Sequence, residues 1–171
     1  MRSTPWIAGL ALALAGCGEL DRFDIPIEGT LAVVGSPVEG VALPEDLPFA
    51  GMESPDFRKA FADNGASIDD VESVKLSSLR ISVQPEGANL DFLDGIEFFI
   101  EAAGQQRRRI AALDPVPDGV DRISLEVTGA ELKPWITADD LTITAKARGV
   151  LPTEDVTLRA KAIFEVDAGL L

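Results

Sequence analysis

Carboxylates are the most frequent chemically active groups in this sequence, which has 29 Asp and Glu among its 171 residues. Several fall in expected turns, where oxygen atoms of neighbouring loops can hold Ca²⁺. These are Asp63, Asp69, Asp70, Glu72, Asp91, Asp94, Asp114, Asp118, Asp139, Asp140, Glu154 and Asp155. A calcium loop starting at Asp63 would place Ile68 where glycine is needed and Val74 where the bidentate Glu belongs. Because turns favour Asp and surface acids maintain solubility, we expect no metal site.

The usual catalytic motifs are missing from the sequence. It has no His and a single Cys, at position 17, so a Cys-His pair, a zinc cluster and an intrachain disulfide cannot form. Gly-x-Ser-x-Gly, Ser-x-x-Lys and glycine-rich phosphate loops do not occur. A glycosidase-like pair of turn carboxylates stays open, because sequence spacing cannot show it. We therefore expect a protein that is not an enzyme and uses no cofactor.

Four cations stand out in an acidic chain whose formal charge is −14 and whose pI is about 4.3. This balance argues against nucleic acid as a partner. Lys146 and Arg148 point away from the core in one expected strand, and Arg159 and Lys161 do so in the next. A hairpin joining the two strands would gather all four on one face. Such a face predicts binding of an anionic polysaccharide, a lipid head group or an acidic envelope protein.

The alternative for these cations is neutralisation across strands. Glu126, Glu165 or similar acids could face them in the sheet and cancel their charge. A second basic run, Arg107 to Arg109, is open to the same two interpretations.

Alternation of apolar and polar residues predicts the elements that position these groups. The expected strands include residues 25–33, 74–83, 96–102, 107–113, 123–127, 141–147 and 156–166. Pro26 indicates an edge strand, and the change of parity at Ser77 and Ser78 indicates a β-bulge. About seven strands at this spacing predict an all-β fold, an antiparallel β-sandwich formed by residues 23–171.

One short helix is expected over residues 54–63. Ser54 would cap it, Pro55 fits its first position, and Phe57 and Phe61 would share one face that plugs the core. A single turn around Pro134 would place Trp135 at the end of the core.

The N-terminus has the pattern of an export signal. Residues 1–16 contain Arg2, an apolar stretch and small residues before Cys17. The stretch Leu14-Ala15-Gly16-Cys17 resembles the lipobox of bacterial lipoproteins. The resemblance implies cleavage before Cys17, palmitate-type lipidation of its thiol and a tether over residues 17–22. Gly18 in place of Asp implies sorting to the outer membrane of the cell envelope.

From Val71 to Asp167 the sequence resembles bacterial surface lipoproteins with immunoglobulin-like β-sandwich domains. The resemblance rests on VESVKLSSLRISV, NLDFLDGIEFFIEAAG and LTITAKARGVLPTEDVTLRAKAIFEVDA. It implies a fold and not an activity. Because this architecture commonly serves as a binding platform and supplies no chemistry by itself, we expect a membrane-anchored lipoprotein whose non-catalytic sandwich is a binding or structural module of the envelope. The alternative is a carbohydrate-binding or carbohydrate-active envelope protein that uses turn carboxylates and an exposed Trp135. A buried Trp135 would favour the first interpretation.

Replacing Cys17 by Ser tests the predicted anchor. The variant should leave the membrane fraction, because no other segment is apolar and long enough to span a bilayer. Membrane retention of the Ser variant, or an unmodified Cys17 in mass spectrometry, would contradict the prediction.

Overall fold

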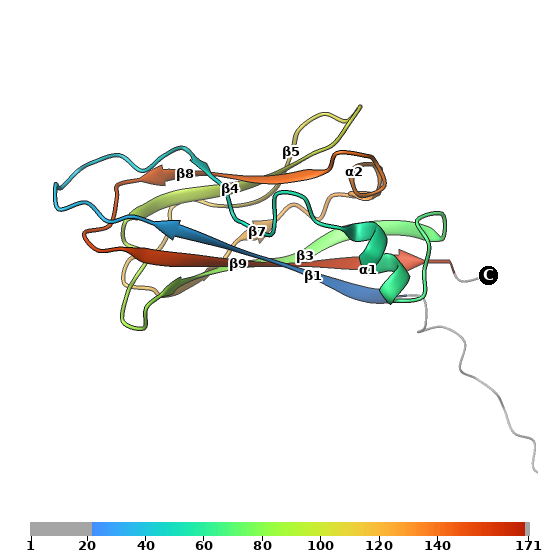
Figure 1. Cartoon of the computed structure of the whole chain (residues 1–171), viewed down its shortest axis with the longest axis horizontal. Coiled ribbons are helices and arrows are strands. Elements are labelled where there is room, and N and C mark those ends of the chain that lie inside the picture. Colours follow the sequence, from blue (N-terminus) through green and yellow to red (C-terminus); the bar gives the residue numbers. More distant parts are fainter. Residues whose placement is uncertain (1–21, 170–171) are drawn as a thin grey trace, which may run out of the picture.

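Two antiparallel sheets stacked face to face form the body of the protein (Figure 1), in a computed structural model that describes residues 22–169. One, here called the β9 sheet, has the order β1 (Arg22–Val33), β9 (Val156–Ala168), β3 (Val71–Gln84) and β6 (Arg122–Ser124). The other, the β4 sheet, has the order β2 (Asp46–Leu47), β8 (Thr142–Gly149), β4 (Leu93–Glu101), β5 (Arg108–Leu113) and β7 (Glu126–Val127). The predicted two-sheet antiparallel sandwich is therefore confirmed.

The strand order differs from the expected immunoglobulin-like one. In an immunoglobulin sandwich the last two strands are neighbours in one sheet. Here β8 pairs with β4 and β2, whereas β9 pairs with β1 and β3 in the opposite sheet. Apart from the two-residue strand β7, the orders β1-β9-β3-β6 and β2-β8-β4-β5 are those of an eight-stranded jelly roll.

The connection between β8 and β9 explains this difference. Its backbone does not turn back on itself but bonds to other loops. The N–H groups of Val150 and Leu151 donate to the carbonyls of Phe92 and Val41, at 2.9 and 2.7 Å. The carbonyl of Pro152 accepts from Ser36 N–H at 2.8 Å. These bonds carry the chain across the end of the sandwich and into the other sheet.

Alternation fixes which side chains face the core. In β9 every even-numbered residue from Val156 to Ala168 is buried, and the odd-numbered ones point outward. In β3 the predicted bulge is present as a register shift between Leu76 and Ser78. Among the strands of the described residues β1 pairs only with β9, which confirms the expected edge position of Pro26, and its other side has one isolated bridge, from Thr30 to Ala50. The expected strand 123–127 is instead two short strands, β6 and β7, in different sheets.

Two short helices lie at the end of the sandwich where β1 begins and β9 ends (Figure 1). α1 spans Phe57–Asp63 and buries Phe57 and Phe61, as predicted. Its N-cap is Asp56 and not Ser54, because the Asp56 carboxylate accepts from the Lys59 N–H at 2.9 Å. α2 spans Lys133–Ile136 and forms the expected turn that places Trp135 in the core. Within residues 22–169 no helix has the length and apolar character needed to cross a membrane.

Candidate functional site

The four cations predicted to share one face lie on two different faces. Lys146 and Arg148 belong to β8 in the β4 sheet, and Arg159 and Lys161 belong to β9 in the β9 sheet. The expected hairpin is wrong, because β8 and β9 do not pair. Only the second pair of cations lies in a basic site.

Lys146 and Arg148 are neutralised by acids. Lys146 Nζ lies 2.5 Å from Glu45 Oε1 and 3.8 Å from Asp46 Oδ1, and Arg148 forms an ion pair with Asp114. The hydrogen bond from Lys146 lowers the pKa of Glu45. A groove of about 700 Å³ lies above these residues, but its cations are already paired. Neutralisation by acids, the alternative considered from the sequence, therefore applies to this face. The acids are Glu45, Asp46 and Asp114 and not Glu126 or Glu165.

Two arginines of the second basic run are also paired. Arg107 Nε lies 2.9 Å from Glu101 Oε1, and its guanidinium carbon lies 4.1 Å from the centre of the Phe99 ring. Arg109 Nη1 lies 2.6 Å from Glu97 Oε1. Acids of β4 therefore neutralise both arginines.

Trp135 is not a surface platform for a ligand. It is only 7% exposed, and its indole N–H donates to the Gln106 carbonyl at 2.9 Å. Arg108 covers the ring, with the guanidinium carbon 4.5 Å from the ring centre. Glu131 holds the segment leading into α2, because it accepts from the Val74 and Lys133 N–H groups at 2.9 and 2.8 Å. These contacts argue against the sugar-stacking role considered from the sequence.

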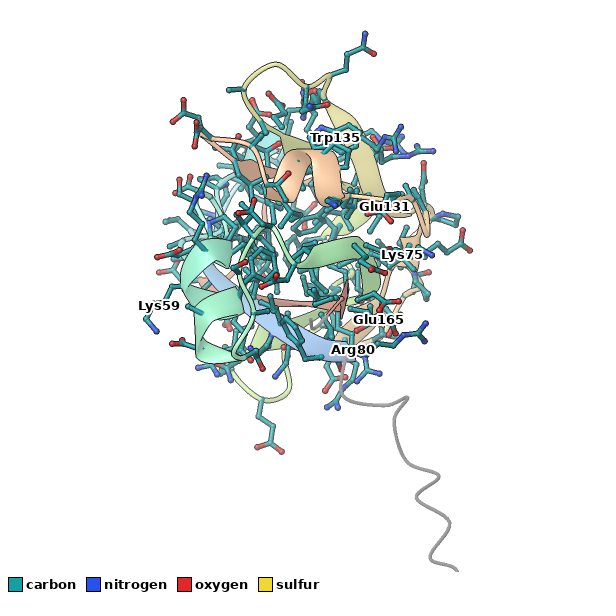
Figure 2. The ribbon with its side chains drawn as sticks, turned by 90° about the vertical axis from the view of Figure 1, so that its right-hand side faces the viewer. Lys59, Lys75, Arg80, Glu131, Trp135 and Glu165 are labelled. Atoms are coloured by element: carbon teal, nitrogen blue, oxygen red, sulfur yellow. The ribbon has the colours of Figure 1, made fainter. Side chains whose placement is uncertain are left out.

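A different groove, of about 520 Å³, lies on the outer face of the β9 sheet. We call it the basic groove, because four cations from three strands line it: Arg80, Arg122, Arg159 and Lys161. Its other polar side chains are those of Glu28, Thr30, Ser82 and Ser124. Figure 2, which views the sandwich from its helical end, places Arg80 on the opposite side of the molecule from Trp135.

Strand register places Arg80 at the centre of these cations. Arg80 lies directly opposite Lys161 of β9. Ser82, two residues along β3, lies between Arg159 of β9 and Arg122 of β6. Diagonal neighbours in an antiparallel sheet are about 7–8 Å apart, so Arg80 is within reach of both other arginines.

The basic groove contains one acid, Glu28 of β1. Its Oε1 lies 2.7 Å from Lys161 Nζ. The hydrogen bond and the charge of Lys161 lower the pKa of Glu28, with a smaller contribution from Arg159. Arg122 pairs with its sequence neighbour Asp121 at 3.2 Å. Within residues 22–169, no ion pair joins Arg80 or Arg159 to an acid.

The turn carboxylates do not assemble into a metal centre in the part of the chain that the structure describes. Across residues 22–169, no group of three or more Asp, Glu, His or Cys is placed to hold a metal ion. Cys17 lies outside the described residues, so the lipid anchor and the envelope localisation stay predictions.

Comparisons with known proteins return viral coat proteins among solved structures. No family model and no curated protein matches the chain. The 60-mer BFDV capsid protein is 8% identical over 88% of this chain and 95% of that one, with a TM-score of 0.35. The Cocksfoot mottle virus structure is 8% identical over 100% and 96% of the two chains, with a TM-score of 0.31. At these TM-scores we assign no function from either protein.

These comparisons correct two expectations drawn from the sequence. The matches are viral coat proteins and not bacterial surface lipoproteins, so the stated family resemblance is wrong. The expected role as a lipoprotein module of the envelope is withdrawn with it. So is its alternative, a carbohydrate-binding or carbohydrate-active envelope protein that uses turn carboxylates. The fold rests on the strand order of the chain itself.

Replacing Arg80 by Gln should stabilise the protein in the absence of ligand. Arg80 faces Lys161, and like charges directly opposite each other destabilise a sheet, so the free energy of unfolding should rise by about 0.2–1 kcal/mol. The gain should disappear in about 1 M salt, which screens exposed charges. Urea denaturation at low and high salt measures both effects.

Lys75 provides the matched control, because it lies on the same strand and face but opposite Glu165 (Figure 2). Lys75→Gln should give no gain in stability at low salt. A destabilised Arg80→Gln protein, or equal gains in the two variants, would contradict the electrostatic account.

Proposed function

We propose that this chain is a non-catalytic binding protein that takes an anionic ligand in the basic groove. The observation that carries the proposal is the gathering of four cations around Arg80 in a chain of charge −14. Two of these cations, Arg80 and Arg159, have no acidic partner among the described residues.

The contrast between the two outer faces supports a role in binding. On the β4 sheet, acids accompany Lys146, Arg148 and Arg109 at ion-pair distance. On the β9 sheet, Glu28 pairs with Lys161 and Asp121 pairs with Arg122, and no acid pairs with Arg80 or Arg159 among the described residues. A groove lined by one sign of charge focuses the electric field and raises the local concentration of oppositely charged ligands. Its volume lies in the range of about 300–1,000 Å³ typical of ligand sites.

The groups in the groove favour binding over bond breaking. The side chains in the groove that could act as nucleophiles are the hydroxyls of Thr30, Ser82 and Ser124, the amine of Lys161 and the carboxylate of Glu28. The sequence has no His to activate a hydroxyl, and Lys161 is paired with Glu28. Guanidinium groups, in contrast, are suited to bidentate contacts with carboxylates, sulfates and phosphates.

The fold by itself does not select a function. Jelly rolls occur in coat proteins, lectins and cupins, so an assignment must rest on the site. Of the predicted ligand-binding residues, Arg159 and Lys161 stay in the proposal. Arg80 and Arg122 replace Lys146 and Arg148, because they line the same groove as Arg159, whereas Lys146 and Arg148 lie on the other sheet and each has an acidic partner.

Calorimetric titration with inorganic phosphate, citrate and a sulfated disaccharide tests the proposal. We expect millimolar or tighter binding of at least one anion. Arg80→Gln and Arg159→Gln should each weaken it about tenfold, since one charge-assisted contact is worth roughly 1.4 kcal/mol or more. Glu28→Gln should tighten it, because the ionised Glu28 carboxylate competes for Lys161.

Arg148→Gln and Lys146→Gln are the controls, because they remove similar charges from the other sheet. Both should bind each anion as the parent does. Absence of binding in the parent, or equal loss in the control variants, would refute the proposed function.

A further inference from the structure

We propose that the ligand is a linear acidic polysaccharide that lies across the strands of the β9 sheet. The inference rests on the proposed function and concerns the same groove. Its basis is the order in which cations and hydroxyls follow one another from strand to strand.

Two rows of outward side chains cross the basic groove. One contains Thr30 of β1, Arg159 of β9, Ser82 of β3 and Arg122 of β6, as the strand register requires. Hydroxyl and cation therefore alternate along this row, which we call the alternating row. Neighbouring strands are about 4.8 Å apart, so its two arginines are about 10 Å apart at the backbone.

The second row reinforces the charge of the first. It contains Glu28, Lys161, Arg80 and Ser124 in the same strand order. Arg80 is diagonal to both arginines of the alternating row and can contact an anion held by either. The four cations are spread over an area too wide for one small anion to contact all of them at once.

A chain of sugars fits this spacing. A linked pyranose ring advances by a step similar to the strand spacing, so charged groups on every second sugar would meet Arg159 and Arg122 in turn. The uncharged sugars between them would place hydroxyls beside Thr30 and Ser82, whose side chains donate and accept hydrogen bonds.

Other anionic macromolecules fit the basic groove less well. No aromatic side chain lines it, so it offers no stacking platform for nucleic acid bases. The central strands of its floor, β9 and β3, pair on both sides, and the edge strand β6 is only three residues long, so a peptide would find few backbone partners there. It is a concave site without exposed large apolar residues, in contrast to the protruding apolar groups that enter a bilayer.

A length series of sulfated oligosaccharides, from two to eight sugars, tests the inference on the full chain by calorimetry. The affinity should rise at least tenfold between two and four sugars. It should then level off, because the four strands span about 14 Å. Arg122→Gln should remove most of this gain with length and weaken the disaccharide much less, since a disaccharide can bind at Arg159 alone.

Lys75→Gln is the matched control, because Lys75 lies on the same face beyond the groove. It should preserve the whole length dependence. Inorganic sulfate, polyphosphate and vesicles containing an anionic phospholipid complete the experiment, and each should bind more weakly than the tetrasaccharide.

The outcomes separate this inference from the proposed function. Suppose that inorganic sulfate and every oligosaccharide bind with equal affinity, and that Arg80→Gln abolishes this binding. That result would overturn the inference of a polysaccharide ligand and would still support the anion site. Tighter binding of polyphosphate or of the vesicles would do the same. Failure of all these anions to bind would refute both.

Discussion

The strict alternation along β9 is the constraint on which the core and the candidate site both depend. Leu158, Ala160 and Ala162 are buried, so Arg159 and Lys161 between them must point to solvent. A slip of one residue would bury both cations and expose the apolar side chains, at a large cost in free energy. Because β9 lies between β1 and β3, the same alternation places the two cations in the middle of the outer face.

The outer face of the β9 sheet places like charges opposite each other, which lowers stability, whereas the outer face of the β4 sheet pairs its cations with acids. Acids are abundant in the chain, and the β4 sheet uses them to neutralise Lys146 and Arg148. Arg80 instead faces another cation across the sheet. Sites that bind charged ligands commonly retain such unfavourable contacts, and stability is lost where function requires them. Stability alone therefore does not account for Arg80 opposite Lys161, whereas the proposed binding of an anion would.

Local features were predictable from the sequence, and non-local ones were not. The bulge near Ser77, the buried faces of Phe57 and Phe61 and the turn at Trp135 follow from parity and helical spacing within a few residues. The sheet to which β9 belongs depends on loop contacts between distant segments, such as that of Leu151 with residue 41. The same limit hid the neighbours of Arg159: its own outward direction was predictable, whereas Arg80 and Arg122 reach it only through strand register.

The most direct test of the account observes the arginine side chains themselves. In NMR spectra of the side-chain Nε–H groups, titration with a sulfated tetrasaccharide should shift the signals of Arg80, Arg122 and Arg159. The signals of Arg107 and Arg109, which are paired on the β4 sheet, should stay in place. Shifts centred on these two residues, or spread evenly over all arginines, would contradict the assignment of the basic groove as the binding site.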